Sequence, residues 1–99
     1  MNKQKDSAFY KKIWQKNEDF DGYCYCEECG LPLQYSASFV SHNLSRGAHP
    51  EPFFRWNENN VSILCIDHHR QWEVGNRKEM KIYPAKKSIM DSMLQQFHK

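Results

Sequence analysis

Two short stretches decide the fold: residues 26–30, CEECG, and residues 65–68, CIDH. The first is a C-x-x-C turn followed by a glycine, and the second is a C-x-x-H pair that begins after 35 intervening residues. Such pairs supply the four thiolate and imidazole donors that tetrahedral structural zinc requires. Gly30 permits the positive φ that these turns often use. We therefore expect a structural Zn²⁺ ion held by Cys26, Cys29, Cys65 and His68.

Two other interpretations of the cysteines remain. A redox C-x-x-C pair normally lies in a βαβ pattern, which this sequence lacks, and it would leave the second pair unexplained. Cys24 extends the first stretch to C-x-C-x-x-C, so a site in which Cys24 replaces Cys26 stays open. We expect Cys24 to be a free thiol or a core residue, because strand alternation would point it the same way as Cys26 without placing it in the turn.

The size of the chain explains why a metal staple would be useful. It has 99 residues, of which 39% are hydrophobic, and its mean hydropathy is −0.89. A chain of this length buries only about two-thirds of its unfolded surface. We therefore expect a single domain over residues 1–99, with a thin core filled largely by aromatic side chains, including Trp56 and Trp72.

Amphipathic helices are predicted at both ends of the chain. Near the start, apolar residues recur at helical spacing, and Asp6 or Ser7 is the expected N-cap. Near the end, Pro84 precedes a second apolar stripe. The stripes consist of Phe9, Tyr10, Ile13 and Trp14, and of Ile89, Met90, Met93, Leu94 and Phe97. We expect both helices to cover the core, with a homodimer interface as the alternative.

Between these helices the sequence favours short strands and loops. Strand-compatible composition occurs at residues 20–25, 38–44 and 61–64. Residues 45–60 are rich in Gly, Pro and Asn and predict a long loop. A short helix is expected from Asp67 to near Gly75. The predicted fold class is therefore α+β.

Charge is unevenly distributed along the chain. Residues 1–19 carry five lysines and three acidic residues, and residues 75–99 carry six basic and two acidic residues. The middle, residues 20–74, carries three arginines and seven acidic residues. Basic ends around an acidic centre favour a polyanionic partner held at the edges, whereas a solvated surface without a partner is the simpler alternative.

The sequence contains no signal for a membrane or for export. No run of about 18 apolar residues occurs, and residues 1–14 contain no apolar stretch of signal-peptide length. We therefore expect a soluble, cytoplasmic protein without a membrane partner.

A second group of polar residues remains once the zinc ligands are assigned. His42 lies near the end of the second strand-like stretch, Asn60 directly precedes the third, and His69 follows His68. Glu73 lies four residues beyond His69 on the expected helix. Side chains at that spacing face the same way and can chelate one divalent cation.

The His-Asn-His order and the paired zinc ligands together resemble the HNH nuclease family in its zinc-stapled form. Residues 40–51, VSHNLSRGAHPE, are similar to the corresponding stretch of small phage and bacterial members, and the resemblance covers about residues 23–75. It implies a ββα-metal core, with a structural zinc knuckle and flanking N- and C-terminal helices. The implied activity is metal-dependent cleavage of DNA phosphodiester bonds, by nicking or by double-strand cleavage, in phage DNA processing or packaging.

The resemblance also implies roles for individual residues. His42 matches the general base that activates water, Asn60 matches the residue that fixes the geometry around that base, and His69 matches a ligand of the catalytic metal. Glu73 stands where many members have a further His, and a carboxylate there favours Mg²⁺ or Mn²⁺. Ser41 stands where many members have a metal-binding His or Asp, so another ligand such as His49 or a water would complete the site.

Three arginines of the motif region are candidates for phosphate contacts, with simple surface solvation as the alternative for each. They are Arg46, Arg55 and Arg70. The expected partner is DNA, and phage packaging proteins are a further candidate. Two other functions compete with the nuclease: a zinc-stapled nucleic-acid-binding module without catalysis, and a structural zinc protein that acts through protein contacts. A binding module has no chemical need for His42, Asn60, His69 and Glu73 together, which favours the enzyme.

Overall fold

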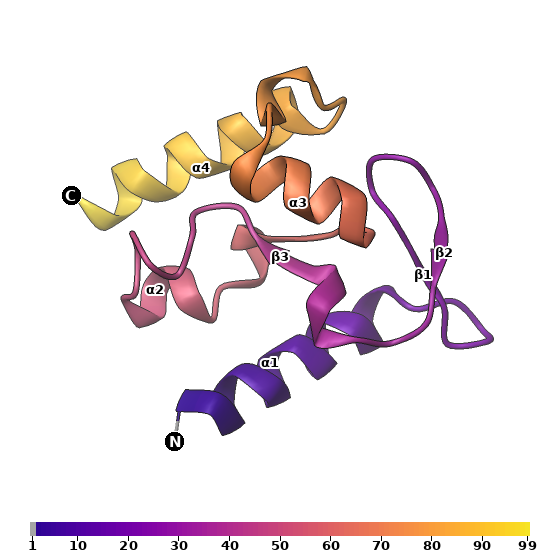
Figure 1. Cartoon of the computed structure of the whole chain (residues 1–99). Helices are drawn as coiled ribbons and strands as arrows, with labels where there is room; N and C mark the ends of the chain where they lie inside the picture. Colours follow the sequence, from indigo (N-terminus) through magenta and orange to yellow (C-terminus); the bar gives the residue numbers. More distant parts are fainter. Residues whose placement is uncertain (1) are drawn as a thin grey trace.

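The computed structural model describes residues 2–99 of the chain. In chain order its helices and strands are α1 (Asn2–Asn17), β1 (Cys24–Tyr25), β2 (Pro32–Leu33), β3 (Val40–His42), α2 (Pro52–Arg55), β4 (Val61–Ile63), α3 (Ile66–Val74) and α4 (Tyr83–Phe97). Short 3-10 turns lie between them at η1 (Ala37–Phe39), η2 (Glu58–Asn60) and η3 (Arg77–Glu79). The fold is mixed α+β, as predicted, with small two-stranded sheets among helices (Figure 1).

The first C-x-x-C stretch forms the turn of an antiparallel hairpin made by β1 and β2. Cys24 lies opposite Leu33 in this hairpin. The turn closes because Gly30 donates its N–H to the Cys26 carbonyl at 2.8 Å. Gly30 has a φ of 78°, which glycine adopts without the steric cost that a side chain would add. The hairpin therefore presents Cys26 and Cys29 on one compact turn.

The second antiparallel pair consists of β3 and β4, and α3 follows β4 almost directly. The register places Ser41 opposite Ser62, and all of β4 is buried. Cys65 is the N-cap of α3. The indole of Trp72 is buried in the core, as predicted, and donates its N–H to the Asn43 carbonyl at 3.2 Å. This bond holds α3 against the end of β3.

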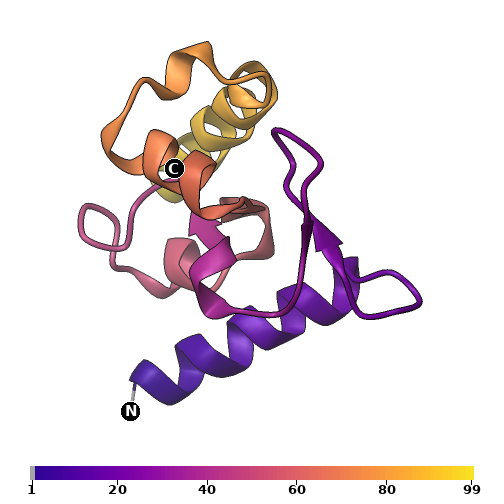
Figure 2. The same cartoon turned by 45° about the vertical axis from the view of Figure 1, so that its right-hand side comes forward.

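The terminal helices lie on opposite sides of β3 and α3 (Figures 1 and 2). Phe9, Tyr10, Ile13 and Trp14 of α1 are all buried, which confirms the predicted stripe. On α4 the stripe is less complete, because Met90 and Met93 are buried while Phe97 is 38% exposed.

Three predictions on local structure are wrong. Residues 20–23 form a turn and not a strand, because the Asp19 carboxylate accepts the N–H groups of Asp21 and Tyr23 at 2.9 Å. Phe20 consequently points into solvent. The loop predicted over residues 45–60 contains α2 and η2. Pro52 starts α2, a position where its fixed φ suits the first helical turn.

The third wrong prediction concerns the N-cap of the first helix. The helix already includes Asn2, so Asp6 and Ser7 lie within it and cap nothing. Asp6 instead lies on the apolar stripe and is buried.

The strand β2 was not predicted, because a strand of two residues is too short to carry a pattern. Trp56 packs against the core and is partly buried.

Candidate functional site

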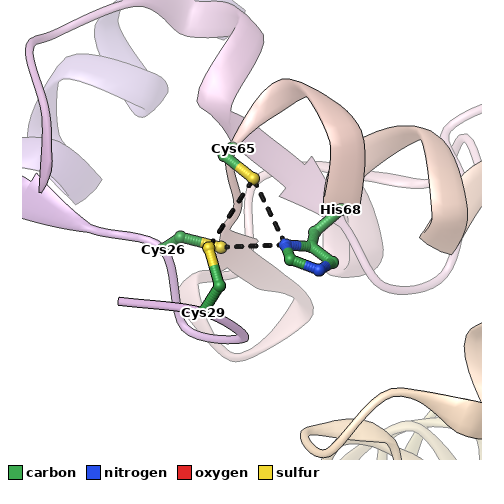
Figure 3. Close-up of side chains that lie close together, drawn as sticks. All are labelled: Cys26, Cys29, Cys65 and His68. Atoms are coloured by element: carbon green, nitrogen blue, oxygen red, sulfur yellow. Dashed lines mark hydrogen bonds between the residues drawn. The ribbon is translucent and has the colours of Figure 1, made fainter. Parts of the chain in front are cut away.

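Four side chains from two distant parts of the chain converge on one point (Figure 3). They are Cys26, Cys29, Cys65 and His68, and their ligand atoms all lie within 4.8 Å of one another. The Nδ1 atom of His68 lies 3.6 Å from the Cys26 sulfur and 3.2 Å from the Cys65 sulfur. The Cys29 and Cys65 sulfurs are 3.9 Å apart. Donors around a tetrahedral zinc ion are separated by about 3.3–3.8 Å, so the cluster can hold such a metal ion.

The electrostatics of the cluster also favour a bound cation. Burial raises the pKa of Cys26, but backbone N–H groups of Cys65, Cys29 and Glu28 outweigh it and lower the pKa to about 7. Burial, together with the neighbouring Cys26 thiol, raises the pKa of Cys65. Further thiolates would repel the first, and a cation at the centre removes that repulsion.

Two glutamates within the first cysteine pair dock the turn onto the rest of the protein. Glu27 donates its N–H to the Ile63 carbonyl at 2.8 Å, and its carboxylate accepts the Ile63 N–H at 2.7 Å. The Glu28 carboxylate accepts two backbone N–H groups from the segment before α4, at 2.9 and 3.1 Å. The turn is therefore fixed to β4 and α4, and the sequence did not reveal these links.

Cys24 lies outside the cluster, as predicted. Its thiol is buried and faces the Trp14 carbonyl at 3.6 Å. Burial raises the pKa of Cys24 to about 11. This cysteine is a core residue with no thiolate character near neutral pH.

The second group of predicted residues lies at a groove of about 910 Å³ beside β3 and α3. Its lining includes His42, Arg46, His49, His69 and Glu73. The structure therefore brings the first and last histidines of the His-Asn-His order, and the glutamate, onto one surface.

His42 is held in a defined orientation. Its Nε2 donates to the backbone carbonyl of Arg55 at 2.8 Å, because a carbonyl can only accept. The ring packs against Phe9 and Tyr10 of α1, with centroid distances of 6.2 and 5.9 Å. Burial lowers the pKa of His42 below its ordinary value of 6.5. The imidazole is therefore neutral at pH 7, and within residues 2–99 its Nδ1 has no hydrogen-bond partner and can accept a proton.

His69 and Glu73 face each other across one turn of α3. The His69 Nδ1 donates to the Ser38 carbonyl at 2.6 Å, and its Nε2 lies 2.7 Å from the Glu73 carboxylate. With the Nδ1 proton committed to Ser38, the Nε2 lone pair would face carboxylate lone pairs. The pair therefore requires either a second ring proton or a cation. An Nδ1–H bond to a backbone carbonyl is also how proteins orient metal-binding histidines.

Asn60 is completely buried behind the groove. Its side-chain oxygen accepts the Leu44 N–H at 2.8 Å, and its amide donates to the carbonyls of Leu44 and Phe54 at 3.0 Å. These bonds tie the segment after β3 to α2. Since α2 also supplies the carbonyl that accepts the His42 Nε2–H, Asn60 supports the histidine without contacting it.

The predicted arginines occupy different environments. Arg46 lines the groove, and its side chain is 46% exposed. The Arg55 side chain is 19% exposed and is engaged by Asp6 through Nε and Nη2, at 2.9 and 2.6 Å. Arg70 is exposed on α3 outside the groove lining. Arg77, which the sequence did not single out, lines the groove with its guanidinium 5.3 Å from the Trp72 ring centroid.

Ser41 does not contribute to the groove. It is completely buried, and its hydroxyl has no hydrogen-bond partner within residues 2–99. The neighbouring β3 residue His42 points to the opposite side, as strand alternation requires. Within residues 2–99, His69 and Glu73 are not joined by a third His, Cys, Asp or Glu in a metal-binding cluster.

Sequence reasoning missed Asp6 as a residue of this region. It accepts hydrogen bonds from Arg46, Arg55 and Trp56. A signal was present, because Asp6 precedes Phe9 and Tyr10 by three and four residues and so falls on the apolar stripe. An acidic residue on such a stripe indicates a buried ion pair.

Comparisons with known proteins gave no match among family models, curated proteins or solved structures. None of the helices in the described part of the chain is long and apolar enough to cross a membrane. The function is therefore inferred from the Cys/His cluster and the groove.

Proposed function

We propose that this protein is a metal-dependent endonuclease of the HNH type that hydrolyses phosphodiester bonds in DNA. One observation carries the proposal: β3 and α3 present an oriented, neutral histidine and a His-Glu pair to the same groove. Phosphodiester hydrolysis needs a base that is neutral near pH 7, a site for a divalent cation and basic contacts to the backbone. His42, the His69–Glu73 pair and Arg46 are suited to these tasks.

In this proposal Cys26, Cys29, Cys65 and His68 would hold Zn²⁺ in a structural role. The four side chains would supply all four ligands of a tetrahedral ion, which would leave no position for a substrate or a water. Because His68 directly precedes His69, the cluster also fixes the start of α3 that carries the groove histidine.

His42 acts as the general base. Its Nε2 is engaged by the Arg55 carbonyl, so Nδ1 is the atom that takes a proton from the attacking water. Burial keeps the pKa of His42 below its ordinary value, which holds the ring neutral and ready to accept a proton at pH 7. Asn60 maintains this arrangement by fixing α2.

His69 and Glu73 would hold Mg²⁺ or Mn²⁺. Such an ion supplies positive charge to the scissile phosphate and to the leaving oxygen. The chain's own contribution is orientation, since the Ser38 carbonyl fixes the ring of His69. Arg46 and Arg77 at the groove are suited to contact neighbouring phosphates.

A catalytically inactive, zinc-stapled nucleic-acid-binding module is the second candidate. It is favoured by Ser41, which is buried away from the groove and supplies no metal ligand there. Among the described residues, the His69–Glu73 pair has no third His, Cys, Asp or Glu to complete a metal-binding cluster. A cytoplasmic location, homodimer formation and a role in phage DNA processing or packaging rest on the sequence alone.

A plasmid-nicking assay tests the proposal. Zinc-loaded protein is incubated with supercoiled DNA and Mg²⁺, Mn²⁺, Ni²⁺ or EDTA. We expect nicking with divalent ions and none with EDTA. As a control, His98→Ala replaces an exposed histidine at the end of α4 and should cleave like the wild type. Binding without cleavage in every divalent ion would favour the inactive module.

A further inference from the structure

Helix α1 carries a carboxylate into the interior of the protein. Asp6 is 6% exposed. One of its oxygens accepts the Arg55 Nε and the Trp56 indole N–H, both at 2.9 Å. The other accepts Arg55 Nη2 at 2.6 Å and Arg46 Nη1 at 3.0 Å. The carboxylate therefore grips the Arg55 guanidinium with two bonds and satisfies both of its own oxygens.

This arrangement is hard to explain by packing alone. Taking a carboxylate and a guanidinium out of water costs free energy, and an apolar pair of similar volume is often at least as stable. The neighbours of Asp6 on the same helical face are apolar, including Phe9 and Ile13. The ion pair instead fixes orientation, since a two-point carboxylate–guanidinium contact holds both side chains in one geometry.

The residue that Asp6 fixes is also the one that orients His42. The Arg55 side chain is held by Asp6, and the Arg55 carbonyl accepts the His42 Nε2–H at 2.8 Å. Phe9 and Tyr10, one turn beyond Asp6 on α1, pack against the His42 ring. Helix α1 therefore contacts His42 directly through its aromatic side chains and acts on it indirectly through Arg55 of α2.

We propose that Asp6 is a positioning residue of the groove, which holds α2 so that the Arg55 carbonyl keeps the His42 Nε2 protonated and its Nδ1 free. The inference rests on the proposed function only in that a fixed base serves catalysis. It makes α1 part of the working site, although this helix lies outside residues 23–75, which carry the His-Asn-His pattern.

The charges around His42 depend on the same carboxylate. The ionisable groups facing the ring are Asp6 and Tyr10 from α1, Arg46 from the segment after β3, and Arg55 from α2. Without Asp6, the two guanidinium groups would lose their counter-charge. His42 would then titrate at a lower pH than in the wild type, because nearby cations disfavour its charged form.

The test uses the full-length, zinc-loaded protein with the substitution Asp6→Asn. The matched control is Glu58→Gln, which removes the carboxylate of an exposed ion pair that Lys16 of the same helix forms with η2 at 2.6 Å. Nitrogen-15 NMR of the imidazoles reports which His42 nitrogen carries the proton and at what pH the ring titrates. Steady-state nicking of an oligonucleotide reports kcat and KM separately.

In Asp6→Asn we expect a mixture of His42 tautomers, a titration displaced to lower pH, and a kcat reduced on the order of 10- to 100-fold with KM nearly unchanged. Glu58→Gln should match the wild type in each readout. Wild-type tautomer, titration and kcat in Asp6→Asn would overturn the inference.

Two further outcomes are decisive. If Asp6→Asn fails to fold, Arg55→Lys takes its place, since it retains the cation but loses the two-point grip, and unchanged His42 signals in that variant overturn the inference. If the wild type cleaves no DNA while Asp6→Asn alters the His42 signals, the positioning link is supported and the nuclease proposal fails.

Discussion

The Cys/His cluster and the groove adjoin at His68 and His69 but differ in how they are built. The cluster gathers four donors within 4.8 Å around a closed centre. The groove is open, offers one His-Glu pair, and relies on backbone carbonyls to orient His42 and His69. A closed donor set is suited to stabilising a fold, whereas an open site leaves room for a substrate. Two adjacent histidines can therefore serve different purposes because their surroundings differ.

The largest effect should follow from breaking the cluster. Cys65→Ser removes a donor, and loss of the metal would cost a large part of the about 5–15 kcal/mol that stabilises a small domain. We expect this variant to lose bound zinc and to unfold, as measured by elemental analysis and circular dichroism. Cys24→Ala is the control, since it removes a buried thiol outside the cluster, and it should retain zinc at a cost of about 1 kcal/mol. A folded, zinc-free Cys65→Ser protein would contradict a structural role of the metal.

Breaking the groove should leave the fold intact. If His69 holds a second metal as proposed, His69→Ala removes one of its donors, so cleavage should fall about 100-fold or more while zinc content and melting temperature stay close to those of the wild type. Excess Mn²⁺ should restore part of the activity, because weakened binding is overcome by concentration. Loss of zinc from His69→Ala would show that the two sites are not separate.

Removing the buried ion pair of α1 should have an intermediate effect on stability, larger than that of removing the exposed pair. Hydrogen bonds from Arg55, which outweigh burial, lower the pKa of Asp6 from 3.8 to about 2. The carboxylate therefore stabilises the fold at pH above about 4, and this contribution is lost as the pH falls toward 2. Asp6→Asn should lose roughly 2 kcal/mol in urea unfolding, equally at about pH 7 and pH 5. A loss that Glu58→Gln reproduces would contradict a special role of the buried pair.

Arg77 should give the smallest effect. It lines the groove, so Arg77→Ala should weaken DNA binding a few-fold without sequence preference and reduce the salt dependence of log K by about one unit of slope. Binding measured by fluorescence anisotropy at several salt concentrations checks this. An unchanged salt slope would show that Arg77 does not contact the DNA.

The cluster was predictable from sequence because its information is local. Each ligand pair is separated by two residues, and a tight turn brings both donors together whatever the rest of the chain does. The strands that carry His42 and precede His69 were also found, since their composition changes sharply beside the polar loop. The prediction failed at Phe20 because hydrogen bonds to the Asp19 carboxylate override strand propensity there.

The supports of the groove could not be predicted in the same way. The contacts of Asp6 with Arg46 and Arg55 span 40 and 49 residues, and the bond from His42 reaches a backbone carbonyl, which has no sequence signature. Asn60 was singled out as a residue that fixes geometry, but its actual partners, the Leu44 and Phe54 backbones, follow from the three-dimensional arrangement alone. Contacts that link distant segments through main-chain atoms leave no pattern to find.

The pH dependence of DNA nicking by the wild type and by His42→Ala, at equal zinc content, tests the central claim most directly. If His42 is the base, the wild-type rate rises with pH around a midpoint below 6.5, because burial lowers the pKa of this histidine. His42→Ala should lose about 10²–10⁴-fold in rate and should lose this rise, while its zinc content and DNA affinity remain unchanged. Cleavage by His42→Ala at the wild-type rate with the same pH profile would contradict the account.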